Sequence, residues 1–315
     1  MDEFQLIRHY FAGLTAGSEG VVLGIGDDAA LLTVPSGHEL VVTTDTLVAG
    51  RHFPLATRPF DIGWKALAVN LSDLAAMGAV PRWFTLALTL PAPDANWLAG
   101  FSEGLKALAD LHGVALVGGD TTRGPLAITI TAMGLVAQGA ALRREGAMAG
   151  DLICVTGTLG DAALALRQLG DDLADPSLRR RLDRPTPRVE AGQRLAAWGM
   201  AAIDLSDGLA GDLNHLLVAN QVGAELDAER LPQSPAFARA APADALQLQL
   251  QGGDDYELCV CLRGGDFLAA QPMLAAIGVP LTRVGVITAA PGLYLRQGGV
   301  PQRIEPRGYQ HFEVA

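Results

Sequence analysis

The stretch Val114-Ala115-Leu116-Val117-Gly118-Gly119-Asp120 is an apolar run that ends in two glycines and a carboxylate. The stretch Val21-Val22-Leu23-Gly24-Ile25-Gly26-Asp27-Asp28 has the same order. Short apolar runs bounded by glycine are typical of buried strands, so each carboxylate is expected where a strand surfaces at the edge of a sheet. Carboxylate oxygens are ligands of hard cations such as Mg²⁺. The pattern therefore predicts sheets whose acidic edges bind divalent metal.

The composition limits both the architecture and the partners. The chain has 315 residues, half of them apolar, which is enough for a large core and favours two domains over one. Its formal charge is −11, because 34 acidic residues outnumber 23 basic ones. A surface that follows nucleic-acid phosphates is therefore not expected. An acidic protein that handles phosphate groups needs metal ions to hold them.

No segment predicts export or membrane insertion. The first ten residues contain acidic side chains and no long apolar core, unlike a secretory signal. The longest uncharged stretch, 124–142, contains a proline and alternating Ile and Thr, which favours a strand over a membrane helix. Cys259 and Cys261 have no further partner at ligand spacing, so they are predicted to be core residues. These features predict a cytoplasmic protein.

The apolar and turn signals predict two mixed α/β (α+β) domains, each with helices covering one side of a sheet. Because the composition turns polar at 143–147, the domains are placed at 1–148 and 149–315. The first has predicted strands at 21–34, 39–48, 84–90, 114–118 and 126–136, and helices at 61–77 and 94–111. The second has predicted strands at 151–155, 200–204, 223–227, 256–262, 281–287 and 292–296, and helices at 161–169, 207–220 and 266–277. The arginines of 177–198 are expected to form a solvated helix face and not a phosphate clamp.

Two common phosphate-binding motifs are absent. Neither of the only lysines, Lys65 and Lys106, follows a glycine, so there is no P-loop. The Gly-rich loop, His-Arg-Asp and Asp-Phe-Gly motifs of protein kinases are missing as well. Phosphate would then be held by glycine-rich backbone and by Mg²⁺ bound to carboxylates.

Three segments of the first domain offer oxygen ligands. Residues 24–28 pair turn glycines with two carboxylates, and residues 43–46 add hydroxyl and carboxyl oxygens. Asp73 lies in an otherwise apolar helix, where an unpaired charge is costly, so it needs a cation, either Lys65 or metal. Each segment alone is also compatible with an ordinary turn or helix cap. The prediction of a metal site depends on their recurrence.

Further segments repeat the pattern. Residues 204–208, Asp-Leu-Ser-Asp-Gly, lie in the second domain, although Ser206 or Asp207 could equally cap the following helix. Residues 118–122 and 252–257 both place paired glycines before acid. Paired glycines let backbone approach a ligand closely, but they also form ordinary turns.

Six motifs occur in a fixed order along the chain, at residues 26–30, 43–53, 68–79, 118–122, 204–209 and 252–258. Together they resemble the thiamine-monophosphate kinase family, from residue 20 to residue 312. Several are shared with the wider superfamily of aminoimidazole ribonucleotide synthetase and selenophosphate synthetase. Residues 51–53 and the ending 308–312 are similar to the thiamine-monophosphate kinases in particular.

The resemblance implies ATP-dependent phosphorylation of thiamine monophosphate to thiamine diphosphate. It implies several Mg²⁺ ions, ATP as co-substrate, and a homodimer in which the sheets of the N-terminal domains pair. It also implies that domain 1–148 binds ATP and metal and dimerises, and that domain 149–315 completes an active-site cleft.

The resemblance further implies roles for individual residues. The implied metal positions are Asp27, Thr43, Thr44, Asp45, Asp73, Asp120, Asp204 and Asp207. The implied ATP contacts are Gly119, Asp120, Arg144 and Ser206. The implied substrate contacts are His52, Asp254 and Tyr309, although the family motif has Glu at the position of Asp254. On the residues alone, His52 could equally be a surface histidine and Tyr309 a tail residue. The roles of Asp28 and Asp255 stay open.

Elementary chemistry agrees with a metal-assisted transfer. A phosphate monoester has its second pKa near about 6, so its attacking oxygen is ionised at neutral pH and needs little help from a general base. The main obstacle is repulsion between two anions, which Mg²⁺ held by carboxylates would reduce during an in-line displacement. No catalytic general base is therefore predicted.

Two other interpretations stay open. Another ATP-dependent synthetase of the superfamily, such as aminoimidazole ribonucleotide synthetase, would share most of the motifs. A non-catalytic protein that binds Mg-nucleotide or cations would also carry acidic clusters. Turnover with different phosphate acceptors separates the three.

Overall fold

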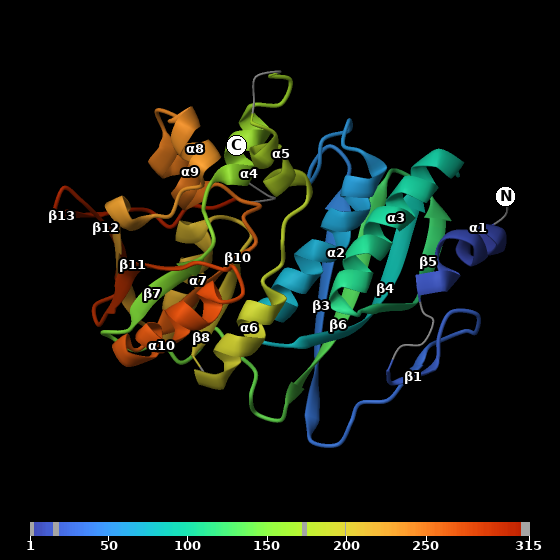
Figure 1. Cartoon of the computed structure of the whole chain (residues 1–315), viewed down its shortest axis with the longest axis horizontal. Helices are drawn as coiled ribbons and strands as arrows, with labels where there is room; N and C mark the ends of the chain where they lie inside the picture. The colour runs from blue at the N-terminus through green and yellow to red at the C-terminus, as the bar shows by residue number, and fades with distance from the viewer. Residues whose placement is uncertain (1–2, 15–18, 172–174, 199, 310–315) are drawn as a thin grey trace. The chain divides into compact units, whose positions relative to one another are not determined.

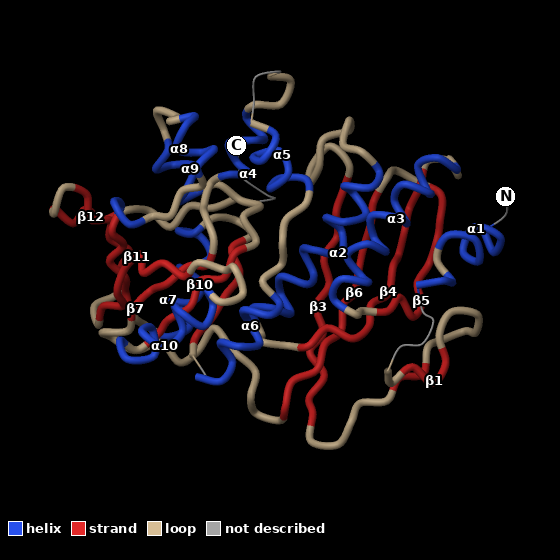
Figure 2. The backbone as a smooth tube through the Cα atoms, in the orientation of Figure 1, coloured by secondary structure: helices blue, strands red, loops and turns tan. Residues whose placement is uncertain are grey.

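The computed structural model describes residues 3–14, 19–171, 175–198 and 200–309. The chain divides into two compact units (Figures 1 and 2). Unit 1 contains Met1–Leu74 and Ala79–Gly139, and unit 2 contains Ala75–Gly78 and Ala140–Ala315. Among the described residues, no helix is both long and apolar enough to cross a membrane.

Unit 1 is built on a four-stranded sheet in the order β3-β6-β4-β5. The strands are β3 (His38–Val48), β6 (Ala127–Ala137), β4 (Val80–Leu90) and β5 (Ala115–Arg123). Only the β4–β5 pair is parallel. Helices α2 (Pro59–Ala76) and α3 (Ala95–His112) cover one face (Figure 1). They touch through glycines, since a Cβ at Gly104 would lie 1.9 Å from the carbonyl oxygen of Phe60.

The other face of this sheet is partly open. Alternate side chains of β3 point to that face and are exposed, including Leu40, Val42 and Val48. A hairpin of β1 (Val21–Leu23) and β2 (Leu31–Leu32) packs its residues against a small core around Trp83. Helix α1 (Glu3–Tyr10) and a 3-10 turn (Ala12–Leu14) precede it.

Unit 2 contains a seven-stranded sheet in the order β13-β12-β9-β11-β7-β10-β8. The strands are β7 (Leu152–Thr156), β8 (Ala201–Leu205), β9 (Gly223–Asp227), β10 (Glu257–Leu262), β11 (Leu281–Thr288), β12 (Gly292–Gln297) and β13 (Val300–Arg303). Every residue of β8 and β10 is buried, so both faces of the sheet are covered there. Cys259 and Cys261 lie in a core shared with α7, and the prediction that they are core residues is confirmed.

The helices of unit 2 are short. They are α4 (Asp161–Arg167), α5 (Pro176–Asp183), α6 (Val189–Leu195), α7 (Leu209–Asn220), α8 (Pro235–Ala240), α9 (Ala245–Gln251) and α10 (Gly264–Ala275). Helices α4, α5, α8 and α9 share a second core around Phe237.

Most predicted elements are present with ends shifted by a few residues, but two predictions are wrong and one strand was missed. The segment 21–34 is a hairpin and not one strand, because its glycines and adjacent carboxylates form a loop between β1 and β2. Strand β13 lies in a segment without a strong apolar signal and was not predicted. Helices covering one side of the sheet are found in unit 1 only, because β8 and β10 of unit 2 are buried on both faces.

Candidate active site

A pocket of about 820 Å³ lies in unit 1. Its polar lining comes from the loop between β1 and β2, which carries Gly24, Gly26, Asp27 and Asp28, and from strand β5, which carries Gly118, Gly119 and Asp120. Its apolar lining includes Ile7 and Phe11, which follow each other at helical spacing, together with Leu86 and Leu116. Ligand sites have this character, with apolar walls and a few converging polar groups. The sequence analysis singled out the carboxylates but not the residues of α1 and the 3-10 turn.

Glycine is required where β5 passes the pocket. Gly119 has φ +150°, and a Cβ there would lie 1.9 Å from the carbonyl oxygen of Leu86 on the neighbouring strand. The missing side chain therefore lets the two backbones pair while Asp120 remains exposed at the pocket. Asp27 shapes its own turn, because its Oδ1 accepts the N–H of Asp28 at 2.8 Å.

Strand β3 places two of the predicted metal residues, Thr43 and Asp45, on the face that α2 covers. The Thr43 hydroxyl donates a short hydrogen bond to Asp73 on α2. The N–H of Asp45 donates to Oδ1 of Asn70, also on α2, at 3.2 Å. Because side chains alternate along a strand, Thr44 points the other way, and its hydroxyl lies 2.9 Å from that of Thr131.

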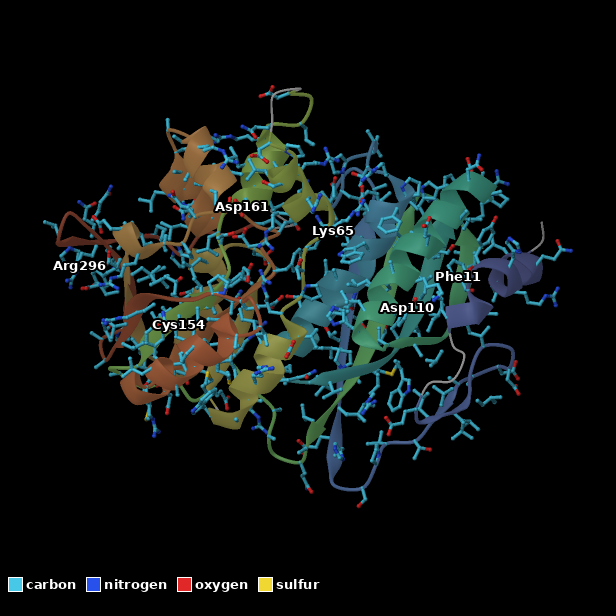
Figure 3. The ribbon with its side chains drawn as sticks, in the orientation of Figure 1. Phe11, Lys65, Asp110, Cys154, Asp161 and Arg296 are labelled. Carbon is cyan, nitrogen blue, oxygen red and sulfur yellow. The ribbon has the colours of Figure 1, made fainter. Side chains whose placement is uncertain are left out.

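His52 is held by the backbone at the end of β3. The N–H of Val48 donates to Nδ1 of His52 at 2.9 Å, so a neutral ring carries its proton on Nε2. Lys65, labelled in Figure 3, is buried on α2. It donates to the carbonyl oxygen of His52 at 3.2 Å. The histidine therefore has a fixed tautomer and a fixed main chain, unlike a mobile surface residue.

In unit 2, three sequence-distant motifs meet through backbone hydrogen bonds. The N–H of Asp254 donates to the carbonyl oxygen of Ser206 at 2.8 Å. The N–H of Tyr309 donates to the carbonyl oxygen of Asp207 at 3.0 Å. The loop after Asp204 thus lies between the two predicted substrate contacts. The remainder of the tail motif, 310–312, lies outside the described residues.

Tyr256 is a functional candidate that sequence reasoning missed. Its hydroxyl donates to Oδ1 of Asp254 at 3.1 Å, and its N–H donates to the carbonyl oxygen of Leu205 at 2.8 Å. Asp254 and Tyr256 have φ of 68° and 49°, a left-handed conformation that is uncommon outside glycine. Such strain persists where the surroundings hold it, often at functional sites. Its only signal in the sequence was its place within motif 252–258.

Asp212, one turn into α7, supports the loop that precedes the helix. Its Oδ2 accepts the N–H of Asp207 at 2.9 Å and that of Gly208 at 3.1 Å. Burial raises the pKa of Asp212 to about 7, and the nearby Asp207 charge adds to this, while the amide donors oppose it. The sequence signal for Asp212 was an acidic residue in the first turn of a predicted helix, where it can accept bonds from free N–H groups.

The Arg144 segment is organised by Asn220 at the end of α7. Nδ2 of Asn220 donates to the carbonyl oxygen of Arg144 at 2.7 Å, and its Oδ1 accepts the N–H groups of Gly146 and Ala147. The Arg144 side chain is exposed. Asn220 therefore holds the conformation of the loop that carries this predicted ATP contact. No residue near the loop in the sequence indicates that Asn220 is its partner.

The donor types present fit Mg²⁺, which prefers one or two carboxylates together with water and phosphate oxygens. Asp27, Asp28 and Asp120 line one pocket, whereas Asp45 lies on β3, at the opposite edge of the sheet from β5, and Asp73 lies on α2. Among the described residues, no three His, Cys, Asp or Glu side chains are grouped closely enough to hold an ion. The site therefore suits an ion that substrate phosphate helps to bind, and not an all-protein cage.

The chain matches the AIR synthase related protein family, with its N-terminal domain over residues 26–136 and its C-terminal domain over residues 148–297. It is 47% identical over 319 residues to thiamine-monophosphate kinase of Escherichia coli (strain K12), with 98% of each chain covered. The chain belongs to the thiamine-monophosphate kinase family.

Two solved structures extend this comparison. Thiamine-monophosphate kinase from Stenotrophomonas maltophilia K279a is 49% identical, covers 94% of this chain and 96% of its own, and superposes with a TM-score of 0.88. AaThiL complexed with AMPPCP and TMP is 30% identical, covers 91% and 92%, and has a TM-score of 0.79. The expected family, the two-domain mixed α/β fold and the kinase class are confirmed. The roles of individual site residues stay predictions.

Proposed function

We propose that this kinase transfers the γ-phosphoryl group of ATP to thiamine monophosphate and forms thiamine diphosphate. The kinship supports this, since a relative of 30% identity binds an ATP analogue and TMP together. The observation that carries the proposal is the meeting of the Ser206, Asp254 and Tyr309 loops in unit 2. Residues implied for ATP and for the thiamine substrate thereby become neighbours.

Unit 1 supplies the proposed nucleotide and metal residues. The pocket lined by Asp27, Gly119 and Asp120 has room for a nucleotide, and its glycines expose backbone to phosphate. Thr43, Asp45 and Asp73, with Asp27 and Asp120, are proposed to hold Mg²⁺ when it is bound, whereas the side chain of Thr44 points to the opposite face of the sheet and is not included. Asp204 and Asp207 of unit 2 are proposed as further metal ligands, and Arg144 and Ser206 as ATP contacts.

Bound Mg²⁺ would neutralise phosphate charge and align the two reacting groups. The protein's own task is positioning. His52, Asp254 and Tyr309 are proposed to orient thiamine monophosphate. Its phosphate oxygen, ionised because the second pKa of a monoester is near about 6, attacks the γ-phosphorus. The bond from the γ-phosphorus to the bridging oxygen breaks, and ADP leaves with that electron pair.

A homodimer is proposed to form through the open face of the unit 1 sheet. Leu40, Val42 and Val48 expose apolar surface there, beside paired threonines of β3 and β6. Val42→Glu is expected to give a monomer in sedimentation velocity, with Val300→Glu on β13 as a control that leaves the dimer intact. A dimer that survives Val42→Glu would refute this interface.

A cytoplasmic location is also proposed for the protein.

The function is tested with γ-labelled ATP, Mg²⁺ and thiamine monophosphate, beside thiamine and formylglycinamidine ribonucleotide as alternative acceptors. Labelled thiamine diphosphate is the expected product. Product from the ribonucleotide would favour a synthetase of the wider family. Binding of Mg-ATP without ADP formation from any acceptor would favour a non-catalytic role.

A further inference from the structure

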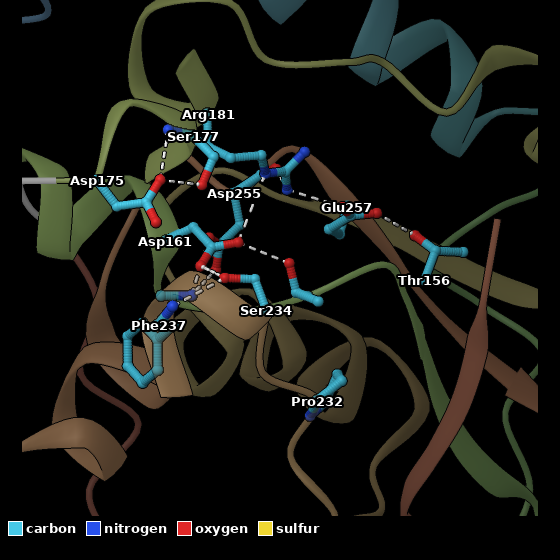
Figure 4. Close-up of polar contacts among 12 residues, drawn as sticks. Thr156, Asp161, Asp175, Ser177, Arg181, Pro232, Ser234, Phe237, Asp255 and Glu257 are labelled. Carbon is cyan, nitrogen blue, oxygen red and sulfur yellow. Dashed lines mark hydrogen bonds and ion pairs between the residues drawn. The ribbon is translucent and has the colours of Figure 1, made fainter. Parts of the chain in front are cut away.

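Unit 2 buries a cluster of charged side chains that the proposed transfer does not use. Glu257, the first residue of β10, is fully buried. Its carboxylate accepts two hydrogen bonds from Arg188, both at 2.6 Å, and one from Arg181 at 2.8 Å. The Thr156 hydroxyl donates to it at 2.7 Å (Figure 4). A bidentate arginine on a buried carboxylate gives fixed geometry as well as attraction.

Two more buried carboxylates, Asp255 and Asp161, lie beside Glu257 and its arginines. Asp255 accepts the N–H of Gly160 at 3.0 and 3.1 Å, and Asp161 accepts hydroxyls from Thr158 and Ser234 (Figure 4). Burial raises the pKa of Asp255 well above its ordinary value, and Arg181 and Gly160 offset this only in part. Burial opposes ionisation of Glu257 too, but the arginines outweigh it and lower its pKa.

The cluster is connected to the Asp254 loop by one donor. Nη2 of Arg181 donates both to Glu257 and, at 3.1 Å, to the carbonyl oxygen of Asp255. Asp255 lies between Asp254 and Tyr256, which both have left-handed backbone. The carbonyl that Arg181 holds is therefore at the centre of the strained segment. On its other side, the segment is held by the backbone of the Ser206 loop.

We propose that Arg181 is a positioning residue, which fixes the backbone around Asp255 and so aims the Asp254 carboxylate at the thiamine substrate, while Glu257 and Arg188 hold Arg181 in place. The proposal rests on the proposed function, because Asp254 contacts the substrate only there. It also corrects the expectation that the arginines of 177–198 form a solvated face, since Arg181 and Arg188 are directed at a buried carboxylate.

Kinetics with two variants test it. Arg181→Met removes the hydrogen bonds to Glu257 and to the carbonyl oxygen of Asp255. Arg181→Lys keeps the charge but loses the planar guanidinium group. Because bonds that involve a charged group contribute about ten-fold or more to an equilibrium, KM for thiamine monophosphate is expected to rise about ten-fold in Arg181→Met and less in Arg181→Lys. KM for ATP is expected to stay within about two-fold. Arg180→Met, exposed on the same helix, is the matched control.

A double-mutant cycle separates positioning from general support of the fold. If Arg181 acts through Asp254, Arg181→Met adds little to KM in an Asp254→Asn background, because the group being aimed is already altered. An equal increase in both backgrounds would overturn the proposal. So would a fall in Tm and active fraction with unchanged KM for thiamine monophosphate.

Hydrogen exchange supplies a readout that needs no substrate. The amides of Asp254 and Tyr256 are expected to exchange faster in Arg181→Met and Arg181→Lys, and to be unchanged in Arg180→Met. Unchanged exchange in the Arg181 variants would overturn the proposal even in an active kinase. A wild-type chain that fails to phosphorylate thiamine monophosphate would instead overturn the proposed function, and the exchange result would still decide whether Arg181 holds the loop.

Discussion

The two units use carboxylates in opposite ways. In unit 1, Asp27, Asp28 and Asp120 are exposed and line a pocket. In unit 2, Glu257 and Asp255 are fully enclosed, with arginines and amides as partners. An exposed carboxylate is hydrated and can exchange water for metal, whereas a buried one must be neutralised where it lies. The exposed carboxylates of the unit 1 pocket are therefore expected to serve chemistry, and the buried Glu257 and Asp255 of unit 2 to serve geometry and stability.

The largest expected effect comes from the pocket of unit 1. Asp120→Asn should lower kcat by about 100-fold or more, because an electrostatic group is lost where phosphate charge must be stabilised. Thermal stability should stay unchanged, since the side chain is exposed. Steady-state kinetics and calorimetry measure the two. Asp110→Asn, an exposed residue of the same unit that binds Lys106, is the control, and an equal loss there would break the comparison.

In the buried network around Glu257, a substitution should mainly lower stability. Glu257→Gln keeps the shape but removes the buried carboxylate that Arg188 and Arg181 share, so the free energy of unfolding should fall by about 3 kcal/mol or more. Urea denaturation measures it. Glu190→Gln breaks the exposed Glu190–Arg194 pair on α6 and should cost less than about 0.5 kcal/mol. Similar losses in both variants would mean that burial does not decide the effect.

Asp255 should make stability depend on pH. Its folded-state pKa is raised above the ordinary 3.8, so the folded chain holds a proton that the unfolded chain releases. Its contribution is complete below pH 3.8 and is lost as pH rises through the raised value. In that window the wild type should lose up to about 1.4 kcal/mol per pH unit relative to Asp255→Asn. Urea titrations at several pH values measure the difference, and parallel curves would contradict it.

The smallest effect concerns the two faces of β3. Thr43 contacts Asp73, whereas Thr44 faces Thr131 on the open side of the sheet. Thr43→Val should therefore reduce kcat about ten-fold through the lost bond to a carboxylate, and Thr44→Val by less than about three-fold. Kinetics at saturating Mg²⁺ compare them. An equal reduction would indicate that the open face also takes part, for example through a second copy of the chain.

Much of the fold was readable because its signals are local. The strand β9 was predicted with its observed ends, since glycine and aspartate bound a short segment in which apolar and polar residues alternate. The hairpin of β1 and β2 was missed because the apolar residues on both sides of Gly24–Asp28 were joined into one predicted strand, although the glycines and carboxylates between them form a loop. Whether a sheet is covered on one face or two depends on which helices return to it, and helical periodicity does not contain that information.

The residues of the candidate site also fall into those that local sequence signals predicted and those that only the structure revealed. Asp120 and Asp254 could be singled out because each belongs to one of the six ordered motifs. Asn220 and Arg181 could not, because they act on loops 74 residues away in sequence. Tyr256 was hidden for a different reason: its importance comes from a left-handed backbone and a hydroxyl direction, and neither is encoded in residue type.

The sequence by itself determined the family, the acidic motifs and most of the strands and helices, because these depend on composition, spacing and local propensity. Only the tertiary structure decided which face of β3 carries Thr43, that the Ser206, Asp254 and Tyr309 loops meet, and that Glu257 is enclosed by Arg181 and Arg188. The physical reason is the short range of the interactions involved. Hydrogen bonds and ion pairs extend only a few ångströms, so they depend on which distant segments the sheet topology brings together.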